Sequence, residues 1–245
     1  VRASNVIYDR AHSAISEITP QDIDCDRLLY GAGWLHFTGI TPALGENVAD
    51  ATLKMVKAAK ERGMIVSCDL NYRAKLWSRE QAGKVMRELL KYVDVLISNE
   101  EDCKDVLGLT AEGSDITGGH LSAEAYGKLG GRVMAMFPNI KYAAFTLRES
   151  ISASQNNWSA VLVTDKKVYR SKKYHLDIVD RVGGGDSFGA GLIYALSSGE
   201  DGQYAVDFAV AASAIKHTVE GDFNVLSAGE VKKLMGGDAS GRVQR

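Results

Sequence analysis

Short apolar runs typical of buried strands alternate with amphipathic segments typical of helices along most of this chain. Two of the expected helices begin with a capping box, formed by Ser78 with Gln81 and by Ser227 with Glu230. Neighbouring parallel strands need a crossover between them, which is usually a helix, so this order predicts an α/β fold with a mostly parallel sheet covered by helices on both faces. In the first half we expect strands at 34–40, 64–68 and 95–97, and helices at 43–62, 78–90 and from the third strand to Gly108.

The second half of the chain adds a hairpin and ends in three consecutive helices. We expect a helix at 122–137, a strand at 142–147, a hairpin of 158–164 with 168–171, and helices at 184–198, 203–219 and from Ser227. The segment 236–245 is rich in Gly, Ser and charged residues and is predicted to be a flexible tail. No linker or internal repeat interrupts the pattern, so residues 1–235 are predicted to form a single domain.

The composition excludes several classes of protein. The 245 residues are 45% hydrophobic and 24% charged, as in an ordinary globular chain, and the net charge of -2 offers no basic surface for nucleic acid or for an anionic membrane. Three cysteines without a C-x-x-C motif and five scattered histidines predict neither a disulfide framework nor a zinc site. We expect no transmembrane helix, no signal peptide and a cytoplasmic location.

Three consecutive glycines and an aspartate, Gly183 to Asp186, directly precede an apolar helical run. Glycines before a helix leave backbone N–H groups uncovered, and the helix N-terminus adds partial positive charge, so the segment suits an anion such as a transferring phosphoryl group. Asp186 beside that anion hole could take a proton from a substrate hydroxyl. The alternative is a tight turn with an acidic helix cap.

Polar clusters follow three of the expected strands. They are Asp69-Leu70-Asn71-Tyr72-Arg73, Asn99-Glu100-Glu101-Asp102 and Thr146-Leu147-Arg148-Glu149-Ser150. Ligands bind at the carboxyl ends of the strands in open α/β sheets, so we expect these clusters and the glycine segment to form one active site. For Asn99, simple capping of the following helix is the alternative.

Two arginines distinguish between classes of acceptor. Arg10 and Arg73 are expected near the acceptor pocket, and an arginine there favours a carboxylate because its donors match two carboxylate oxygens. Together they indicate a sugar acid, whereas each alone would more simply form a surface salt bridge. There is no Walker A or protein-kinase glycine motif, which excludes those two solutions to phosphoryl transfer.

The segment from Asp180 to Gly191 resembles the C-terminal signature of the ribokinase-like (PfkB) carbohydrate kinases. Further motifs look like those of the 2-keto-3-deoxygluconate kinases within that family, and the resemblance runs from about Val6 to Leu234. These motifs are Tyr8-x-Arg10, the segments 35–44 and 69–77, Thr146 to Ser150, and His217 to Asn224. The resemblance implies a ribokinase-like three-layer fold and ATP-dependent phosphorylation of the 6-hydroxyl of 2-keto-3-deoxygluconate.

The resemblance also implies roles for particular residues. Asp186 would be the catalytic base, with Gly183, Gly184 and Gly185 as the anion hole. The sugar acid would contact Tyr8, Arg10, Asn71, Arg73 and Asp186. The nucleotide would contact Asn99, Asp102, Thr146, Arg148, Gly183, Gly185 and Asn224. Metal-associated carboxylates would be Glu101, Asp102 and Asp180, serving Mg²⁺ and, at Asp180, a monovalent cation.

Three departures from the family pattern leave alternatives open. The family's Asn-x-x-Glu pattern here ends in Asp102, with Glu101 adjacent, so either carboxylate could serve. Arg181 replaces a residue that is often small, which leaves the monovalent cation open. Family members begin with a longer N-terminal portion, so we expect the N-terminal strands and most of a small β lid to be absent here. A kinase for a neutral sugar such as fructose or ribose and a catalytically incomplete nucleotide-binding fragment remain the alternative functions. The assembly state is also open, and a homo-oligomer is one option.

Overall fold

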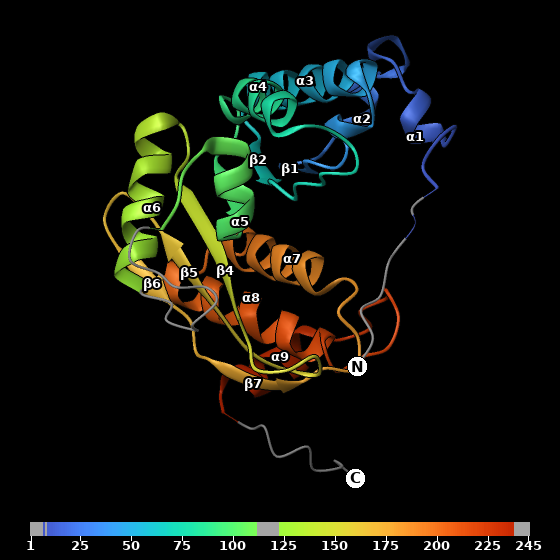
Figure 1. Ribbon diagram of the computed structural model, residues 1–245. Helices are drawn as coiled ribbons and strands as arrows, with labels where there is room; N and C mark the ends of the chain where they lie inside the picture. The colour runs from blue at the N-terminus through green and yellow to red at the C-terminus, as the bar shows by residue number, and fades with distance from the viewer. Residues whose placement is uncertain (1–6, 8, 112–122, 238–245) are drawn as a thin grey trace. The chain divides into compact units, whose positions relative to one another are not determined.

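The computed structural model describes Ile7, residues 9–111 and residues 123–237 (Figure 1). The chain divides into two compact units. Unit 1 comprises Val1–Glu112 and Lys128–Ala144, and unit 2 comprises Gly113–Gly127 and Phe145–Arg245. The single domain expected over residues 1–235 therefore stays a prediction, and residues 238–245 of the expected tail lie outside the described part.

Unit 1 contains three parallel strands in the order β1, β2, β3. They are β1 (Trp34–Thr38), β2 (Ile65–Asp69) and β3 (Val95–Ser98). Helices α3 (Glu46–Glu61) and α4 (Arg79–Leu90) connect them, and the Ser78–Gln81 capping box begins α4 as predicted. Gly63, with a φ of 71°, turns the chain from α3 into β2. The predicted strand–helix order of this half is thus confirmed.

Several short elements of unit 1 were not predicted. They are α1 (Ala14–Glu17), the 3₁₀ turns η1 (Pro20–Asp22) and η2 (Pro42–Leu44), and α2 (Cys25–Leu28). The expected helix after β3 consists of α5 (Glu100–Asp102) and the π-helical η3 (Cys103–Leu107), and it ends at the left-handed Gly108. One-turn elements carry too few residues for a hydrophobic period to be detected.

Helix α6 (Ala123–Met136) and strand β4 (Tyr142–Ser150) each have residues in both units. Strand β4 is longer than the predicted 142–147. Thr146 to Ser150 therefore belongs to the strand itself, and the expectation that this cluster follows the strand is wrong. Burial alternates from Phe145 to Ser150, since Phe145, Leu147 and Glu149 are each less exposed than the residue that follows them, and this is the pattern of an extended strand.

In unit 2, β5 (Gln155–Val163) pairs antiparallel with both β6 (Val168–Arg170) and β7 (Tyr174–Asp177). The β5–β6 pair confirms the predicted hairpin, whereas β7 was not predicted. Helices α7 (Gly184–Ser197), α8 (Gly202–Lys216) and α9 (Ala228–Met235) follow. A Cβ on Gly191 of α7 would lie 2.9 Å from the Ala209 Cα of α8, so this glycine permits the two helices to pack closely.

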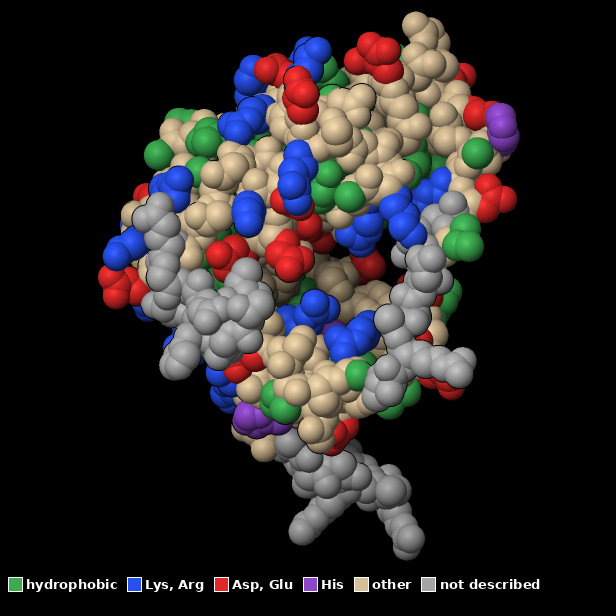
Figure 2. Space-filling view, viewed as in Figure 1, with side chains coloured by type: hydrophobic (Ala, Val, Ile, Leu, Met, Phe, Trp, Pro, Cys, Tyr) green, Lys and Arg blue, Asp and Glu red, His purple; other side chains and the backbone are tan. Residues whose placement is uncertain are grey.

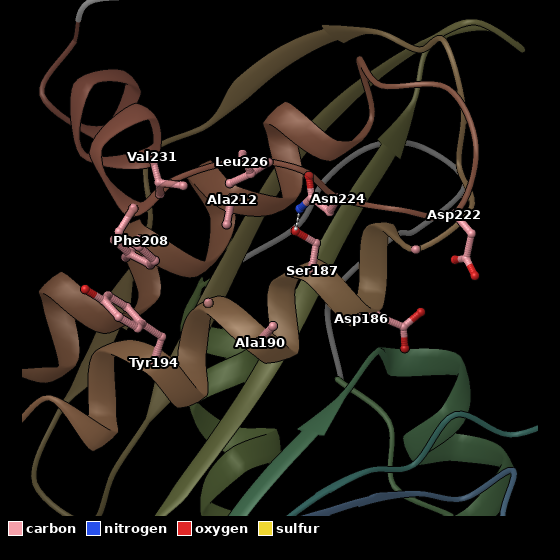
Figure 3. Close-up of a pocket in the computed structure, with 13 residues that line it drawn as sticks. Asp186, Ser187, Ala190, Tyr194, Phe208, Ala212, Asp222, Asn224, Leu226 and Val231 are labelled. Atoms are coloured by element: carbon pink, nitrogen blue, oxygen red, sulfur yellow. Dashed lines mark hydrogen bonds between the residues drawn. The ribbon is translucent and has the colours of Figure 1, made fainter.

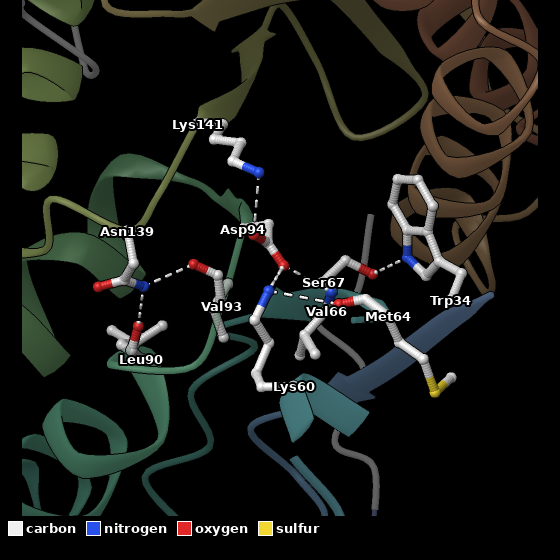
Figure 4. A network of polar contacts seen from close by, with 10 residues as sticks. All are labelled: Trp34, Lys60, Met64, Val66, Ser67, Leu90, Val93, Asp94, Asn139 and Lys141. Atoms are coloured by element: carbon white, nitrogen blue, oxygen red, sulfur yellow. Dashed lines mark hydrogen bonds and ion pairs between the residues drawn. The ribbon is translucent and has the colours of Figure 1, made fainter. Parts of the chain in front are cut away.

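A buried carboxylate joins the amino ends of the strands in unit 1 (Figure 4). Asp94 is 5% exposed, and its Oδ2 accepts hydrogen bonds from Lys60 Nζ at 2.6 Å and from the Val66 amide at 2.9 Å. Lys141 Nζ lies 3.5 Å from Oδ1. Because the carboxylate is paired with charge and hydrogen-bonded, its burial is compatible with a stable core.

Acidic and basic side chains are mixed over the face shown in Figure 2. Within the described residues, no helix combines the length and the apolar character that crossing a membrane requires.

Candidate active site

The start of α7 in unit 2 is built around three glycines with different surroundings. Gly183 precedes the helix with a left-handed φ of 74°, and a Cβ there would lie 3.0 Å from the Asp222 carbonyl oxygen. A Cβ on Gly184 would lie 2.6 Å from His217 Cε1. A Cβ on Gly185 would meet no atom within 4 Å. The first two glycines are thus required by packing, whereas the third keeps the space around the helix start open.

Asp186 lies exposed in the first turn of α7, at the edge of a cavity of about 620 Å³. Figure 3 shows Asp186 and Asp222 at one end of this pocket and Tyr194 and Phe208 at the other. The pocket is therefore polar beside the helix N-terminus and apolar further along. A mainly apolar cavity with a few convergent polar groups is the usual form of a small-molecule site.

Asn224 lies between the two ends of the pocket. Its Nδ2 is 2.5 Å from Ser187 Oγ. Its Oδ1 is buried and has no hydrogen-bond partner in the described part of the chain. A buried acceptor without a partner is costly, so this atom marks a position where a ligand N–H or O–H would be favourable. Ser187 was not among the predicted site residues, although it directly follows Asp186 in the glycine segment.

Positive charge gathers near the glycine loop. Burial, together with the charge of Arg148, lowers the pKa of Arg181. Burial lowers the pKa of His217 as well, and the charges of Arg181 and Lys216 add to that effect. The positive charges of Arg148, Arg181 and Lys216 stabilise an anion bound beside them, whereas the lowered pKa favours the neutral ring of His217. Of the predicted nucleotide residues in β4, Arg148 is exposed and Thr146 is half-buried.

Asp180 is held by the backbone. Its Oδ1 accepts the Val182 amide at 3.1 Å and its Oδ2 accepts the Gly221 amide at 2.9 Å. These hydrogen bonds lower the pKa of the Asp180 carboxyl. Asp180 therefore joins the strand end before the glycine loop to the turn after α8.

In unit 1, the predicted acceptor residue Asn71 lies in a strained loop after β2. Its φ is 39°, a left-handed value that is uncommon for residues other than glycine. Its Nδ2 donates to Thr38 Oγ1 at 3.2 Å, so the end of β1 orients the amide. A Cβ on Gly39 would lie 2.0 Å from the Leu70 carbonyl oxygen, which explains why glycine is required where the two strand ends meet. Sequence reasoning missed the role of Thr38.

The clusters after β2 and β3 come together in unit 1. Asn99 caps α5, because its Oδ1 accepts the Asp102 amide at 2.8 Å, and its Nδ2 donates to Asp102 Oδ2 at 2.9 Å. The capping alternative is therefore confirmed as the local role of Asn99. Burial raises the pKa of Asp102 to about 6, and the positive charge of Arg73 partly offsets this rise. Arg73 also donates from Nη1 to the Tyr72 carbonyl oxygen at 2.9 Å.

The predicted site residues that remain are Tyr8, Arg10 and Glu101. Tyr8 lies outside the described residues, and Arg10 is half-buried ahead of α1. Glu101 is exposed in α5 beside Asp102. Within the described ranges, no three His, Cys, Asp or Glu side chains are grouped so that they could hold a metal ion.

The N-terminus of α7 and the adjacent Asp186 carboxylate lie at the polar end of the pocket. This arrangement suits a phosphotransferase. The chain belongs to the pfkB family carbohydrate kinases. The family model matches residues 154–228, and a 2-dehydro-3-deoxygalactonokinase of Haloferax volcanii is 31% identical over 97% of this chain and 68% of its own length.

Two further relatives agree with this assignment. A 2-dehydro-3-deoxygluconokinase of Thermoproteus tenax is 30% identical over 95% of this chain and 63% of its own length. The crystal structure of the 2-dehydro-3-deoxygluconokinase of Thermotoga maritima is 49% identical, with a TM-score of 0.90 over 96% of this chain and 70% of that chain. The chain thus spans about two thirds of the length of these relatives. The predicted family and the ribokinase-like α/β fold are confirmed.

Proposed function

We propose that the chain transfers the γ-phosphoryl group of ATP to the 6-hydroxyl of 2-keto-3-deoxygluconate. The observation that carries this proposal is the pocket of unit 2, in which Asp186 and the open glycine loop lie at the polar end of an otherwise apolar cavity. The names of the relatives support the substrate class, since those described above are kinases of 2-dehydro-3-deoxy sugar acids.

The nucleotide would occupy this pocket. Its base would pack against the apolar end at Tyr194 and Phe208, and the free Asn224 Oδ1 would accept a hydrogen bond from it. Its phosphates would extend toward the glycine loop, where the backbone amides of α7 and the charge of Arg148 favour an anion.

In the transfer step, Asp186 would accept the proton of the sugar hydroxyl as its oxygen bonds to the γ-phosphorus. The bond between that phosphorus and the β,γ-bridging oxygen breaks, and ADP leaves. The amides of Gly183, Gly184 and Gly185 would hold the charge on the transferring group. Magnesium would be bound mainly by the nucleotide phosphates, and the carboxylate of Asp102 or Glu101 would orient its water ligands.

The sugar acid would be held by Tyr8, Arg10, Asn71 and Arg73. Arg73 has further N–H donors besides the one bonded to Tyr72, and a guanidinium presents them in a fork that matches a carboxylate. The Thr38–Asn71 hydrogen bond would fix the amide that receives the sugar hydroxyls.

The first test is ADP release with ATP and Mg²⁺, with 2-keto-3-deoxygluconate, its galacto epimer, fructose and ribose as acceptors. We expect turnover with the keto acids alone. Turnover with fructose or ribose would favour a neutral-sugar kinase. Nucleotide binding without turnover of any acceptor would indicate a catalytically incomplete fragment.

Two variants test the assigned roles. Asp186→Asn should abolish turnover and leave ATP binding, measured by calorimetry, unchanged; persistent turnover would refute the base assignment. Arg73→Ala should raise the KM for the keto acid about tenfold or more, because a hydrogen bond to a charged group is lost. Arg79→Ala is its control, since the exposed Arg79 pairs with Asp105 on the surface and should leave that KM unchanged.

A further inference from the structure

Lys216, the last residue of α8, is fully buried. Its relative exposure is 0%, and its Nζ donates to the carbonyl oxygens of Val219 at 3.1 Å and of Gly221 at 2.7 Å. A lysine is almost never fully buried unless its ammonium group is paired. The structure therefore contains a fixed internal cation in the turn that follows α8.

This cation lies against the glycine loop. Lys216 Cε is 3.3 Å from the position that a Cβ on Gly183 would take. Its charge also acts on the Asp180 carboxyl, and Asp180 accepts the amides of Val182 and Gly221. One ammonium group thus acts on Asp180, on the glycine loop at Gly183 and on the turn at Gly221.

The resemblance to the family left a monovalent cation open at Asp180. Such an ion needs carbonyl and carboxylate oxygens that are free to replace its water. Here the carbonyls of Val219 and Gly221 already accept hydrogen bonds from Lys216, and each Asp180 oxygen accepts a backbone amide. The ammonium group of Lys216 therefore already occupies the position between these carbonyls, and its positive charge opposes a second cation there.

We propose that the ammonium group of Lys216 takes the place of a monovalent cation and positions the glycine loop for phosphoryl transfer. This inference rests on the proposed function, because the loop matters only if it holds the transferring group. Lys216 acts here as a positioning residue, since its contacts are with the backbone. Its charge additionally favours an anion bound at the start of α7.

The first test compares the intact protein in potassium, sodium and choline chloride at equal ionic strength. We expect the same kcat and the same Tm in all three salts. Activation or stabilisation of the unsubstituted protein specifically by potassium or sodium would overturn the proposal. The thermal readout does not depend on turnover, so it stands even if the proposed substrate is wrong.

The second test removes the ammonium group. Lys216→Ala should lower kcat about tenfold or more and change the sugar KM little, because a displaced loop weakens transition-state binding. Ammonium or potassium ions should then raise both kcat and the Tm of this variant, since the vacated carbonyls can bind them. Failure of every monovalent cation to raise either quantity would overturn the proposal.

Two further variants separate this role from a general effect on folding. Lys216→Gln keeps a hydrogen-bond donor without the charge, and it should also lose kcat while remaining folded by circular dichroism. Lys54→Met is the matched control, because Lys54 Nζ likewise donates to two carbonyls, those of Pro20 and Ile23, within unit 1. Its kcat should stay unchanged in every salt. A Lys216→Gln variant with full kcat would refute the role of the charge.

Discussion

The ionised carboxylate of Asp102 is expected to destabilise the folded protein. Burial raises its pKa from 3.8 to about 6, and the charge of Arg73 and hydrogen bonds from Asn99 and the Tyr72 backbone only partly compensate. The folded state therefore holds the proton more tightly than the unfolded chain. Stability from this group is fully present below pH 4 and is lost as pH rises through 6. A difference of roughly 2 pKa units corresponds to about 3 kcal/mol above pH 7.

Asp102→Asn removes this cost. The amide keeps an oxygen that can accept from Asn99 Nδ2, but it gives up another hydrogen bond, which costs about 1 kcal/mol. We expect a net stabilisation of about 2 kcal/mol at pH 8. At pH 4 the wild-type carboxyl is largely protonated, so only the lost hydrogen bond remains and the variant should be up to about 1 kcal/mol less stable. Urea unfolding at pH 4, 6 and 8, in buffer with a chelator and without nucleotide, measures the difference.

The same variant should lose kinase activity if Asp102 orients magnesium-bound water. A substitution that stabilises the fold and impairs turnover is the expected sign of a residue kept for function. Asp22→Asn is the control, because hydrogen bonds from Thr19 lower the pKa of that exposed carboxyl, so this variant should gain no stability at pH 8. A destabilised Asp102→Asn protein at pH 8, or an effect equal at pH 4 and pH 8, would refute the reasoning.

Three further predictions concern the glycines at the start of α7, the His217 ring and the buried Asp94 carboxylate. Gly184→Ala should destabilise the protein by about 2 kcal/mol or more in thermal melts, because its new methyl group would clash with the His217 ring. Gly185→Ala should fold normally, since that site is open, and should lower kcat measured by ADP release. Burial lowers the pKa of His217, so the folded state favours the neutral ring. The free energy of unfolding should therefore fall as pH drops below about 6.5, and His217→Gln should show a smaller fall in urea unfolding. Asp94→Ala should lower the free energy of unfolding, measured in urea, by about 3 kcal/mol, because it removes the carboxylate that accepts from Lys60 and from the buried Val66 amide. Asp26→Ala is the control, since Asp26 is an exposed partner of Arg62, and an equal loss of stability in that variant would contradict this reasoning.

Signals carried by neighbouring residues were readable from the sequence. The capping boxes at Ser78 and Ser227, the hairpin between β5 and β6, and the start of α7 after Gly183 all depend on chemistry within a few positions. The motif that contains Asp186 likewise lies in one continuous segment, so the family could be identified before any fold was known. The end of β4 was missed, because the sequence after Leu147 is polar and gives no apolar signal of a strand.

The electrostatic state of the site depended on the tertiary structure. The raised pKa of Asp102 comes from its burial, and the approach of Arg73 from a different loop limits that rise. The hydrogen bonds from Asn224 to Ser187 and from Asn71 to Thr38 likewise join segments that are distant in the chain. Lys216 looks like an ordinary last-turn lysine until its ammonium group is found buried between two carbonyls. Local propensity acts over one or two turns, whereas desolvation and charge pairing are set by whatever the fold brings within a few ångströms.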